Sequence, residues 1–271
     1  MMSSKMLQLL NNGLNEQKSS ALVTITSHPQ QDFLGKKFLV WEDGTTYHEY
    51  IETENVSVSL IDLCQSFIQK EKTKCIRFQL NGIEIEAFVE VFQPEPHLII
   101  AGAGHVCEPV VQFASLLNYR ITVIDDRKEL ARKERFPFAN EVICCSFMDY
   151  FRDCQITANT WILLLTRGHQ FDVISLQELL KREDSPAYIG MIGSRRRIAG
   201  VLEQLREDFS EKALDHIFTP VGLDIGAETP SEIAISILAE MLMVKNKKAG
   251  QSLSQEIRGL AKLGFRGGKN G

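Results

Sequence analysis

Two closely spaced glycines and a following aspartate carry the clearest chemical signal in the chain. Gly102 and Gly104 have the spacing of the first two glycines of the G-x-G-x-x-G fingerprint, with Cys107, a small residue, at the third position. Such glycines permit a tight turn and bring backbone N–H groups close to a phosphate. A helix that begins at Gly104 or His105 would direct the positive end of its dipole at that phosphate. Asp125, 18 residues after Cys107, would accept a hydrogen bond from a ribose hydroxyl, so the set predicts a phosphate-binding turn that allows a dinucleotide as ligand.

Further loops that contain glycine, histidine, arginine or aspartate follow the other expected strands. In a doubly wound parallel sheet, ligands bind beyond the carboxyl ends of the strands, where the strand order reverses. We therefore expect these loops to converge with the glycine turn on one cleft. The candidate binding residues are Gly102, Ala103, Gly104, His105, Asp125, Asp126, Arg127, Thr166, Arg167, Gly168, His169, Gly193, Ser194, Arg195, Gly222 and Asp224.

Three consecutive arginines follow one of these strands and begin an expected helix. Cations at a helix start oppose the helix dipole, which favours an anionic ligand there. We expect Arg195 to contact an anionic part of the ligand, with His169 at its polar ring edge. The helical step of about 100° turns Arg196 and Arg197 away from that ligand. The alternatives are that some of the arginines are simply solvated and that His105 and His169 are only helix caps or surface residues.

The elements that position these loops alternate between strand and helix. Their continuous apolar runs are typical of strands buried on both faces of a parallel sheet. The expected strands are His97–Ala101, Arg120–Asp125, Glu141–Cys145, Trp161–Leu165, Ala187–Ile192 and His216–Thr219, and the expected helices lie near 105–118, 127–135, 172–182, 195–209 and 230–245. Only a turn is expected around Met148–Asp153. The pattern predicts an α/β fold, a Rossmann-like doubly wound parallel sheet in the strand order 3-2-1-4-5-6.

A smaller α+β domain is expected before this sheet. Its helices are expected over 3–18 and Ser59–Lys70, and its strands over Ala21–Thr26, Lys37–Trp41, Thr46–Ile51, Cys75–Leu80 and Ile83–Val91. The dipeptide Asn81-Gly82 predicts a tight hairpin turn between the last two strands. Two prolines mark residues 93–96 as a linker. We expect the small domain over 1–92, the Rossmann-like domain over 97–248 and a glycine-rich tail over 249–271.

Composition and charge exclude several classes of partner. The net charge of −5 argues against a nucleic-acid partner, which needs a basic face. No apolar run reaches the roughly 18 residues of a membrane span, and the first residues lack the apolar core of a signal peptide. The six cysteines, at 64, 75, 107, 144, 145 and 154, have no C-x-x-C spacing. We expect a cytoplasmic protein with reduced cysteines and no membrane contact.

The loop sequences also resemble a known family. The segments AGAGHV…ITVIDDR, LTRGHQFD, YIGMIGSRRR and PVGLDIGAETPSEIAISILAEML together are similar to the XdhC/CoxI family of xanthine dehydrogenase accessory proteins. The resemblance implies a chaperone without catalytic residues of its own that binds molybdenum cofactor (molybdopterin). It further implies that the chaperone promotes sulfuration of the cofactor and its insertion into xanthine dehydrogenase or a related molybdenum hydroxylase of purine catabolism. A sulfur-donating cysteine desulfurase would be a second partner, and we expect a homo-oligomer.

One segment departs from the pattern of that family. Members usually carry Gly-Gly-Cys-x-Glu soon after the Asp-Gly turn, whereas Thr45–Tyr50 reads TTYHEY here. The metal ligands therefore stay unassigned. We expect neither Cys64 nor Cys75 to bind molybdenum, because Cys64 belongs to the apolar stripe of a helix and Cys75 begins a hairpin strand.

Two other functions remain open at this point. An NAD(P)-dependent oxidoreductase would use Asp125 on the ribose and His169 as an acid or base, but the cleft loops hold no clear lysine–histidine or tyrosine–lysine pair. A nucleotide-binding regulatory protein would use the same glycine turn. Bound pterin and molybdenum would favour the cofactor chaperone, and bound nicotinamide would favour the oxidoreductase.

Overall fold

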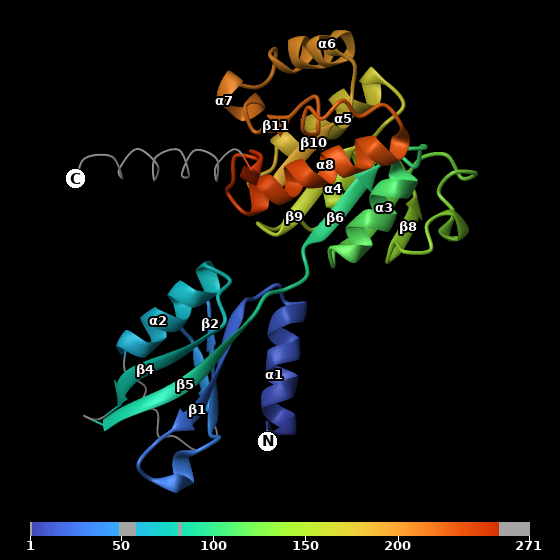
Figure 1. Cartoon of the computed structure of the whole chain (residues 1–271). Coiled ribbons are helices and arrows are strands. Elements are labelled where there is room, and N and C mark those ends of the chain that lie inside the picture. Colours follow the sequence, from blue (N-terminus) through green and yellow to red (C-terminus); the bar gives the residue numbers. More distant parts are fainter. Residues whose placement is uncertain (1, 49–57, 81–82, 255–271) are drawn as a thin grey trace, which may run out of the picture. The chain divides into compact units, whose positions relative to one another are not determined.

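The computed structural model describes residues 2–48, 58–80 and 83–254. The chain divides into two compact units, Met1–Glu95 and Pro96–Gly271, so the boundary falls within the expected linker (Figure 1). The end of the expected strand Thr46–Ile51, the turn Asn81-Gly82 and most of the expected tail lie outside the described residues. Within the described part of the chain, no helix is both long enough and apolar enough to span a bilayer.

The first unit is an antiparallel sheet with a helix on each face. Its elements are α1 (Ser4–Asn15), β1 (Ser20–Ser27), a 3-10 turn (Gln31–Phe33), β2 (Lys37–Trp41), β3 (Thr46–His48), α2 (Val58–Gln69), β4 (Lys74–Leu80) and β5 (Ile83–Phe92). The strand order is β3-β2-β1-β5-β4. Alternation along β1 divides its side chains, since Leu22 packs with Met6 and Leu10 of α1, whereas Val23 packs with Cys64 of α2.

The second unit is a parallel sheet of six strands in the order β11-β10-β9-β6-β7-β8. This is the expected order 3-2-1-4-5-6, so both the fold class and the strand order are confirmed. Its elements are β6 (His97–Ala101), α3 (Cys107–Leu116), β7 (Arg120–Asp125), a 3-10 turn (Lys133–Arg135), β8 (Glu141–Cys144), α4 (Phe147–Asp153), β9 (Thr160–Leu164), α5 (His169–Leu180), β10 (Tyr188–Met191), α6 (Arg195–Leu205), α7 (Glu211–Leu214), β11 (Ile217–Phe218) and α8 (Pro230–Lys245).

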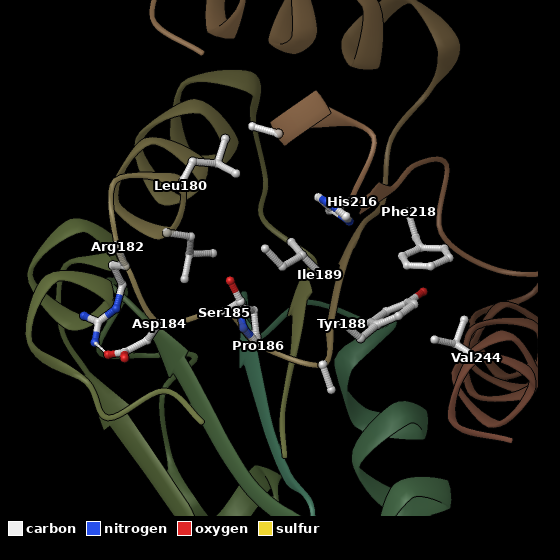
Figure 2. A pocket seen from close by; sticks show the side chains of 13 residues that line it. Leu180, Arg182, Asp184, Ser185, Pro186, Tyr188, Ile189, His216, Phe218 and Val244 are labelled. Atoms are coloured by element: carbon white, nitrogen blue, oxygen red, sulfur yellow. Dashed lines mark hydrogen bonds and ion pairs between the residues drawn. The ribbon is translucent and has the colours of Figure 1, made fainter. Parts of the chain in front are cut away.

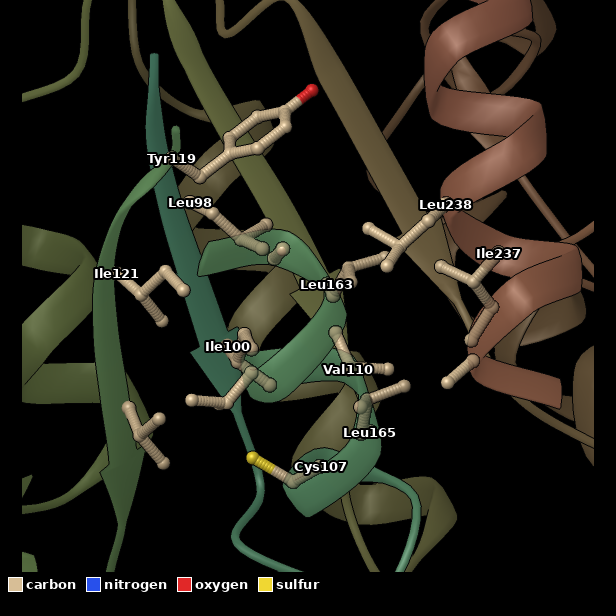
Figure 3. Packing of buried hydrophobic residues seen from close by; sticks show 14 of the residues in the cluster. Leu98, Ile100, Cys107, Val110, Tyr119, Ile121, Leu163, Leu165, Ile237 and Leu238 are labelled. Carbon is tan, nitrogen blue, oxygen red and sulfur yellow. The ribbon is translucent and has the colours of Figure 1, made fainter. Parts of the chain in front are cut away.

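Two apolar clusters bury the two faces of this sheet. On one face, Leu98 and Ile100 of β6 pack with Val110 of α3 and Ile237 of α8 (Figure 3). On the other face, residues of α4, α5, α6 and α7 pack with the alternate residues of the same strands. Because β7 follows β6 on one side and β9 lies on its other side, the chain reverses direction across the sheet between β6 and β9. That reversal is where a doubly wound sheet opens a crevice.

Three local expectations in this unit are wrong. Residues 127–135 do not form an α-helix, because the Asp125 carboxylate accepts the Arg127 N–H and holds the chain in a turn. A helix, α4, stands where only a turn was expected, with Ser146 as its N-cap and Phe147 and Phe151 buried on one side. The helix after the glycine turn begins at Cys107 rather than at Gly104 or His105.

Candidate functional site

Gly102 lies where the backbones of two neighbouring loops touch. Its φ is +113°, a conformation that side chains rarely adopt, and its N–H donates to Ile124 O over 2.8 Å. A Cβ at this position would lie 2.3 Å from Leu165 O in the loop after β9. Gly102 is therefore required for the close approach of the two central loops of the crevice.

Gly104 has a different environment from that of Gly102. A Cβ built on Gly104 has no heavy atom within 4 Å, and the neighbouring His105 is exposed. The helix that follows, α3, has Val106 as its N-cap and no side chain that accepts a hydrogen bond from its first turn. The Cys107 N–H already donates to Gly104 O over 3.1 Å and Pro109 has no N–H, so the donors left for an anionic group are the N–H groups that precede Cys107 and that of Glu108.

Asp125 is a buried framework residue. Its carboxylate is fully buried and accepts hydrogen bonds from the Ala103 N–H (2.7 Å), the Arg127 N–H (3.0 Å) and the Arg127 guanidinium (2.8 Å from Nε and from Nη2). Burial raises its pKa, but the hydrogen bonds from Arg127 and Ala103 outweigh burial and bring the pKa to about 2. The expected contact of Asp125 with a ribose hydroxyl does not fit this burial, and Arg127 is folded back onto Asp125.

Asp126 and Arg167 form a bidentate ion pair between the loops after β7 and β9. Nη1 and Nη2 of Arg167 lie 2.5 and 2.9 Å from Oδ1 and Oδ2 of Asp126, and the guanidinium carbon lies 3.9 Å from the Phe171 ring centroid. Because β6 lies between β7 and β9, the pair spans the end of β6, where the glycine turn lies. The two side chains remain 31% and 37% exposed, so Arg167 is accessible to an anion that competes with Asp126.

A buried network links Thr166, Asp172 and Arg197. Thr166 Oγ1 donates to Asp172 Oδ1 over 2.6 Å, and Arg197 Nε donates to Asp172 Oδ2 over 2.7 Å. Arg197 Nη2 also donates to Thr166 O and Oγ1. Burial raises the pKa of the Asp172 carboxyl, and the hydrogen bonds from Thr166 and Arg197 offset part of that rise. The network fixes the start of α5 against the start of α6.

This network corrects the expectation for the arginines of α6. Arg197 was expected to turn away from the cleft, but its side chain reaches back over the first turn to the loop after β9. Arg195 is exposed, and no hydrogen bond or ion pair joins its side chain to another described residue. Ser194 is the N-cap of α6 and accepts from the Arg197 N–H over 3.4 Å, and Gly193 precedes it.

Gly168 and His169 begin α5. Gly168 is the N-cap and supplies no side chain to the first turn. His169 Nε2 would lie 3.4 Å from a Cβ placed on Gly200, so the imidazole rests against α6. His169 is thus half-buried at the start of α5, with its ring against α6.

Gly222 and Asp224 belong to a separate part of the sheet edge, after the outer strand β11. The Gly222 N–H donates to Glu240 Oε2 over 3.0 Å, and Ser236 Oγ donates to Leu223 O over 2.6 Å. Among the described residues, Asp224 has no hydrogen bond or ion pair. Within the same part of the chain, no hydrogen bond joins Gly222 or Asp224 to the glycine turn, so the site has its centre at the loops after β6, β7 and β9.

Sequence reasoning missed Asp172, Arg135 and the role of Arg197. Arg135 Nη1 donates to Ala103 O over 3.0 Å and its guanidinium pairs with Glu108, so it supports the glycine turn from outside the expected motifs. Nothing local in the sequence around Arg135 indicates this contact. Asp172 in the first turn of a helix, together with Thr166 before it, was a usable signal for a loop-to-helix hydrogen bond.

A cavity of about 420 Å³ lies at the opposite, amino-terminal end of β10 (Figure 2). Tyr188, Ile189 and Phe218 line it, with His216 and Arg182 at its sides. It contains none of the expected binding residues, so it is distinct from the carboxyl edge of the sheet.

The described residues do not cluster as metal ligands. They contain no group of three or more histidine, cysteine, aspartate or glutamate side chains placed to hold a metal ion. Cys64 and Cys107 are buried, and burial raises the pKa of Cys64 to about 12, so these thiols are protonated small apolar side chains. Cys75 and Cys144 are exposed.

Comparison with known proteins identifies the family of the unit that contains the parallel sheet. The sequence pattern of the XdhC Rossmann domain matches residues 98–241, more than half of the 271 residues. The Escherichia coli (strain K12) protein YqeB is 37% identical over 171 residues, 62% of this chain and 31% of YqeB. A probable xanthine dehydrogenase subunit of Bacillus subtilis (strain 168) is 28% identical over 162 residues, 60% of this chain and 47% of that protein. The match thus spans less than half of the length of either relative.

A solved structure extends the similarity to both units. The crystal structure of a xanthine dehydrogenase from Bacillus halodurans matches with a TM-score of 0.53, 91% of this chain and 98% of that chain covered, at 22% identity. At this identity the match shows a shared fold. The domain match, the glycine turn and the strand order agree, and the chain belongs to the XdhC family.

Proposed function

We propose that this chain is a cytoplasmic accessory protein of xanthine dehydrogenase or a related molybdenum hydroxylase. In this proposal its Rossmann-like unit binds the molybdenum cofactor and presents it for sulfuration, with a cysteine desulfurase as sulfur donor, and for insertion. Membership of the XdhC family supports the accessory role, as do the xanthine dehydrogenase names of the Bacillus relatives. The bound cofactor would supply the molybdenum and dithiolene chemistry, while the residues of this chain would bind and orient it.

The observation that carries the proposal is the open turn at Gly104 beside the exposed pair of Asp126 and Arg167. The phosphate of a phosphorylated pterin needs backbone N–H donors and a nearby cation, as the turn before α3 and Arg167 would provide. No atom fills the space that a Cβ of Gly104 would enter, so the residues present fit such a group. Arg167 would exchange the carboxylate of Asp126 for the phosphate.

The same geometry disfavours a dinucleotide. A ribose hydroxyl needs a free acidic acceptor at the end of the second strand, but both oxygens of Asp125 are occupied and buried. Asp126 is the next acid, and it is already paired with Arg167. A ligand with a terminal phosphate and without an adenosine ribose fits the hydrogen-bonding groups of this crevice better.

Ligand titration tests the proposal against the oxidoreductase alternative. Purified molybdenum cofactor and NADH are titrated separately into the full chain under anaerobic conditions, and heat of binding and pterin fluorescence are recorded. We expect saturable binding of the cofactor and at least tenfold weaker binding of NADH. Tighter binding of NADH would contradict the proposal.

A further inference from the structure

The strand β4 is an edge of the antiparallel sheet in the first unit, beside α2 (Figure 1). Hydrogen bonds alternate along antiparallel strands, and the Ile25 N–H donates to Lys36 O on the β2 side of β1. The direction of the backbone groups alternates from residue to residue, and the registers of β1 with β5 and of β5 with β4 extend this alternation to β4. The backbone N–H and C=O groups of Cys75, Arg77 and Gln79 therefore point away from the sheet. The described chain thus has an open row of donors and acceptors on β4.

A groove of about 780 Å³ runs beside this edge. Leu63 and Phe67 of α2 line one side, and residues 74–77 of β4 line the other. Leu63 and Phe67 are only partly buried by the core of this unit. An open strand edge next to a helix with apolar side chains is the arrangement by which an extended segment is bound as an added strand, with backbone bonds for affinity and a groove for alternate side chains.

The charges at the start of β4 specify one end of such a segment. Lys70, Lys72 and Lys74 surround a single acid, Glu71. In the described chain, no hydrogen bond or ion pair occupies the ammonium groups of Lys72 and Lys74, whereas Arg77 is paired with Glu86 over 2.6 Å. A strand added antiparallel to β4 would place its carboxyl end beside these two lysines.

We propose that the β4 edge binds an extended segment of a partner protein as an additional antiparallel strand. The segment would place an apolar side chain against Leu63 and Phe67 and carboxylates of its carboxyl end beside Lys72 and Lys74. A second copy of this chain fits less well. In an antiparallel pairing of two β4 strands, the lysines would face the end of β4 that reads RFQL, which has no acid.

Peptide binding to the full chain tests this proposal. The probe is the free-acid peptide Ser-Thr-Val-Thr-Val-Asp-Glu, and its matched control is the same peptide with alternate backbone nitrogens methylated. Amide hydrogen exchange and chemical shifts are followed on the labelled chain. We expect the probe to slow exchange at Cys75, Arg77 and Gln79 and the methylated control to bind at least tenfold more weakly, because methylation removes the donors that pair with the edge.

Variants of the protein test the same contacts as the methylated peptide. Arg77→Pro removes an outward N–H and keeps the ladder to β5, so it should weaken probe binding at least tenfold, whereas Arg77→Ala, which keeps the N–H, should change it by less than threefold. The double change Lys72→Glu and Lys74→Glu should also weaken binding about tenfold. Circular dichroism checks that the variants fold. If Arg77→Pro does not fold, the comparison of the probe with its methylated control tests the same backbone hydrogen bonds.

Three results would overturn the proposal. The first is the absence of probe binding at millimolar concentration. The second is equal binding of the methylated peptide. The third is protection of the β4 amides that rises with protein concentration without peptide, which would assign the edge to a second copy.

Discussion

Two glycine-containing loops at the same edge of the parallel sheet differ in what surrounds them. The loop after β11 is held on α8, because Glu240 and Ser236 bond to Gly222 and Leu223. The loop after β6 is held only at its base, by Gly102 and Ala103, and is open at Gly104. A glycine turn whose N–H is bonded to a neighbouring helix contributes to stability, whereas a turn bonded only at its base leaves N–H groups available to a ligand. The comparison separates framework residues from binding residues.

The largest loss of stability is expected from Arg197→Ala. Removal of the guanidinium leaves the buried Asp172 carboxylate with Thr166 as its remaining partner, which should lower the free energy of unfolding by about 3–5 kcal/mol. Urea denaturation of the variant measures the effect. Arg196→Ala, an exposed neighbour, is the control and should stay within about 0.5 kcal/mol. Equal effects of the two changes on the free energy of unfolding would show that the contacts of Arg197 do not stabilise the fold.

The glycine turn itself should respond differently at its two glycines. Gly102→Ala places a Cβ against Leu165 O at a positive φ and should cost about 3 kcal/mol of unfolding free energy. Gly104→Ala meets no atom and should cost less than about 1 kcal/mol. Thermal and urea unfolding of both variants check this difference. Similar losses of unfolding free energy at both positions would contradict the claim that Gly102 is packed at the base of the turn and Gly104 lies at its opening.

Acid should weaken the framework through Asp125. The folded pKa of about 2 lies below the unfolded value, so the carboxylate contributes stability above about pH 4 that is lost as the pH falls toward 2. The difference in unfolding free energy between the wild type and Asp125→Asn should therefore shrink by about 2 kcal/mol between pH 5 and pH 2. Urea titrations across this range measure it. A difference that stays constant with pH would show that the charge of Asp125 contributes nothing.

The pair of Asp126 and Arg167 should affect binding with little effect on stability, because both side chains are partly exposed. Arg167→Ala should weaken cofactor binding about tenfold to a hundredfold, the equivalent of a lost charge-assisted hydrogen bond. Asp126→Asn frees Arg167 and should strengthen binding several-fold. Cofactor titration into both variants checks the opposite signs. Weaker binding by Asp126→Asn would indicate that Asp126 itself contacts the ligand.

The sequence predicts the framework of this sheet better than its side-chain partners. Apolar runs and glycine spacing indicated the strand order and the position of the turn, because burial and backbone geometry act locally along the chain. The destinations of Arg197, Arg135 and Asp125 were not predictable, because each depends on a group that is distant in sequence or on a hydrogen bond that competes with helix formation.

The central claim is that the open turn at Gly104 receives the phosphate of the cofactor. Gly104→Val extends into that opening, where a Cβ has no heavy atom within 4 Å, so the thermal midpoint and circular dichroism should remain near those of the wild type. Titration of molybdenum cofactor into Gly104→Val, by calorimetry, is the most direct test. The account predicts at least a hundredfold loss of affinity in a folded variant. Undiminished binding by folded Gly104→Val would contradict it.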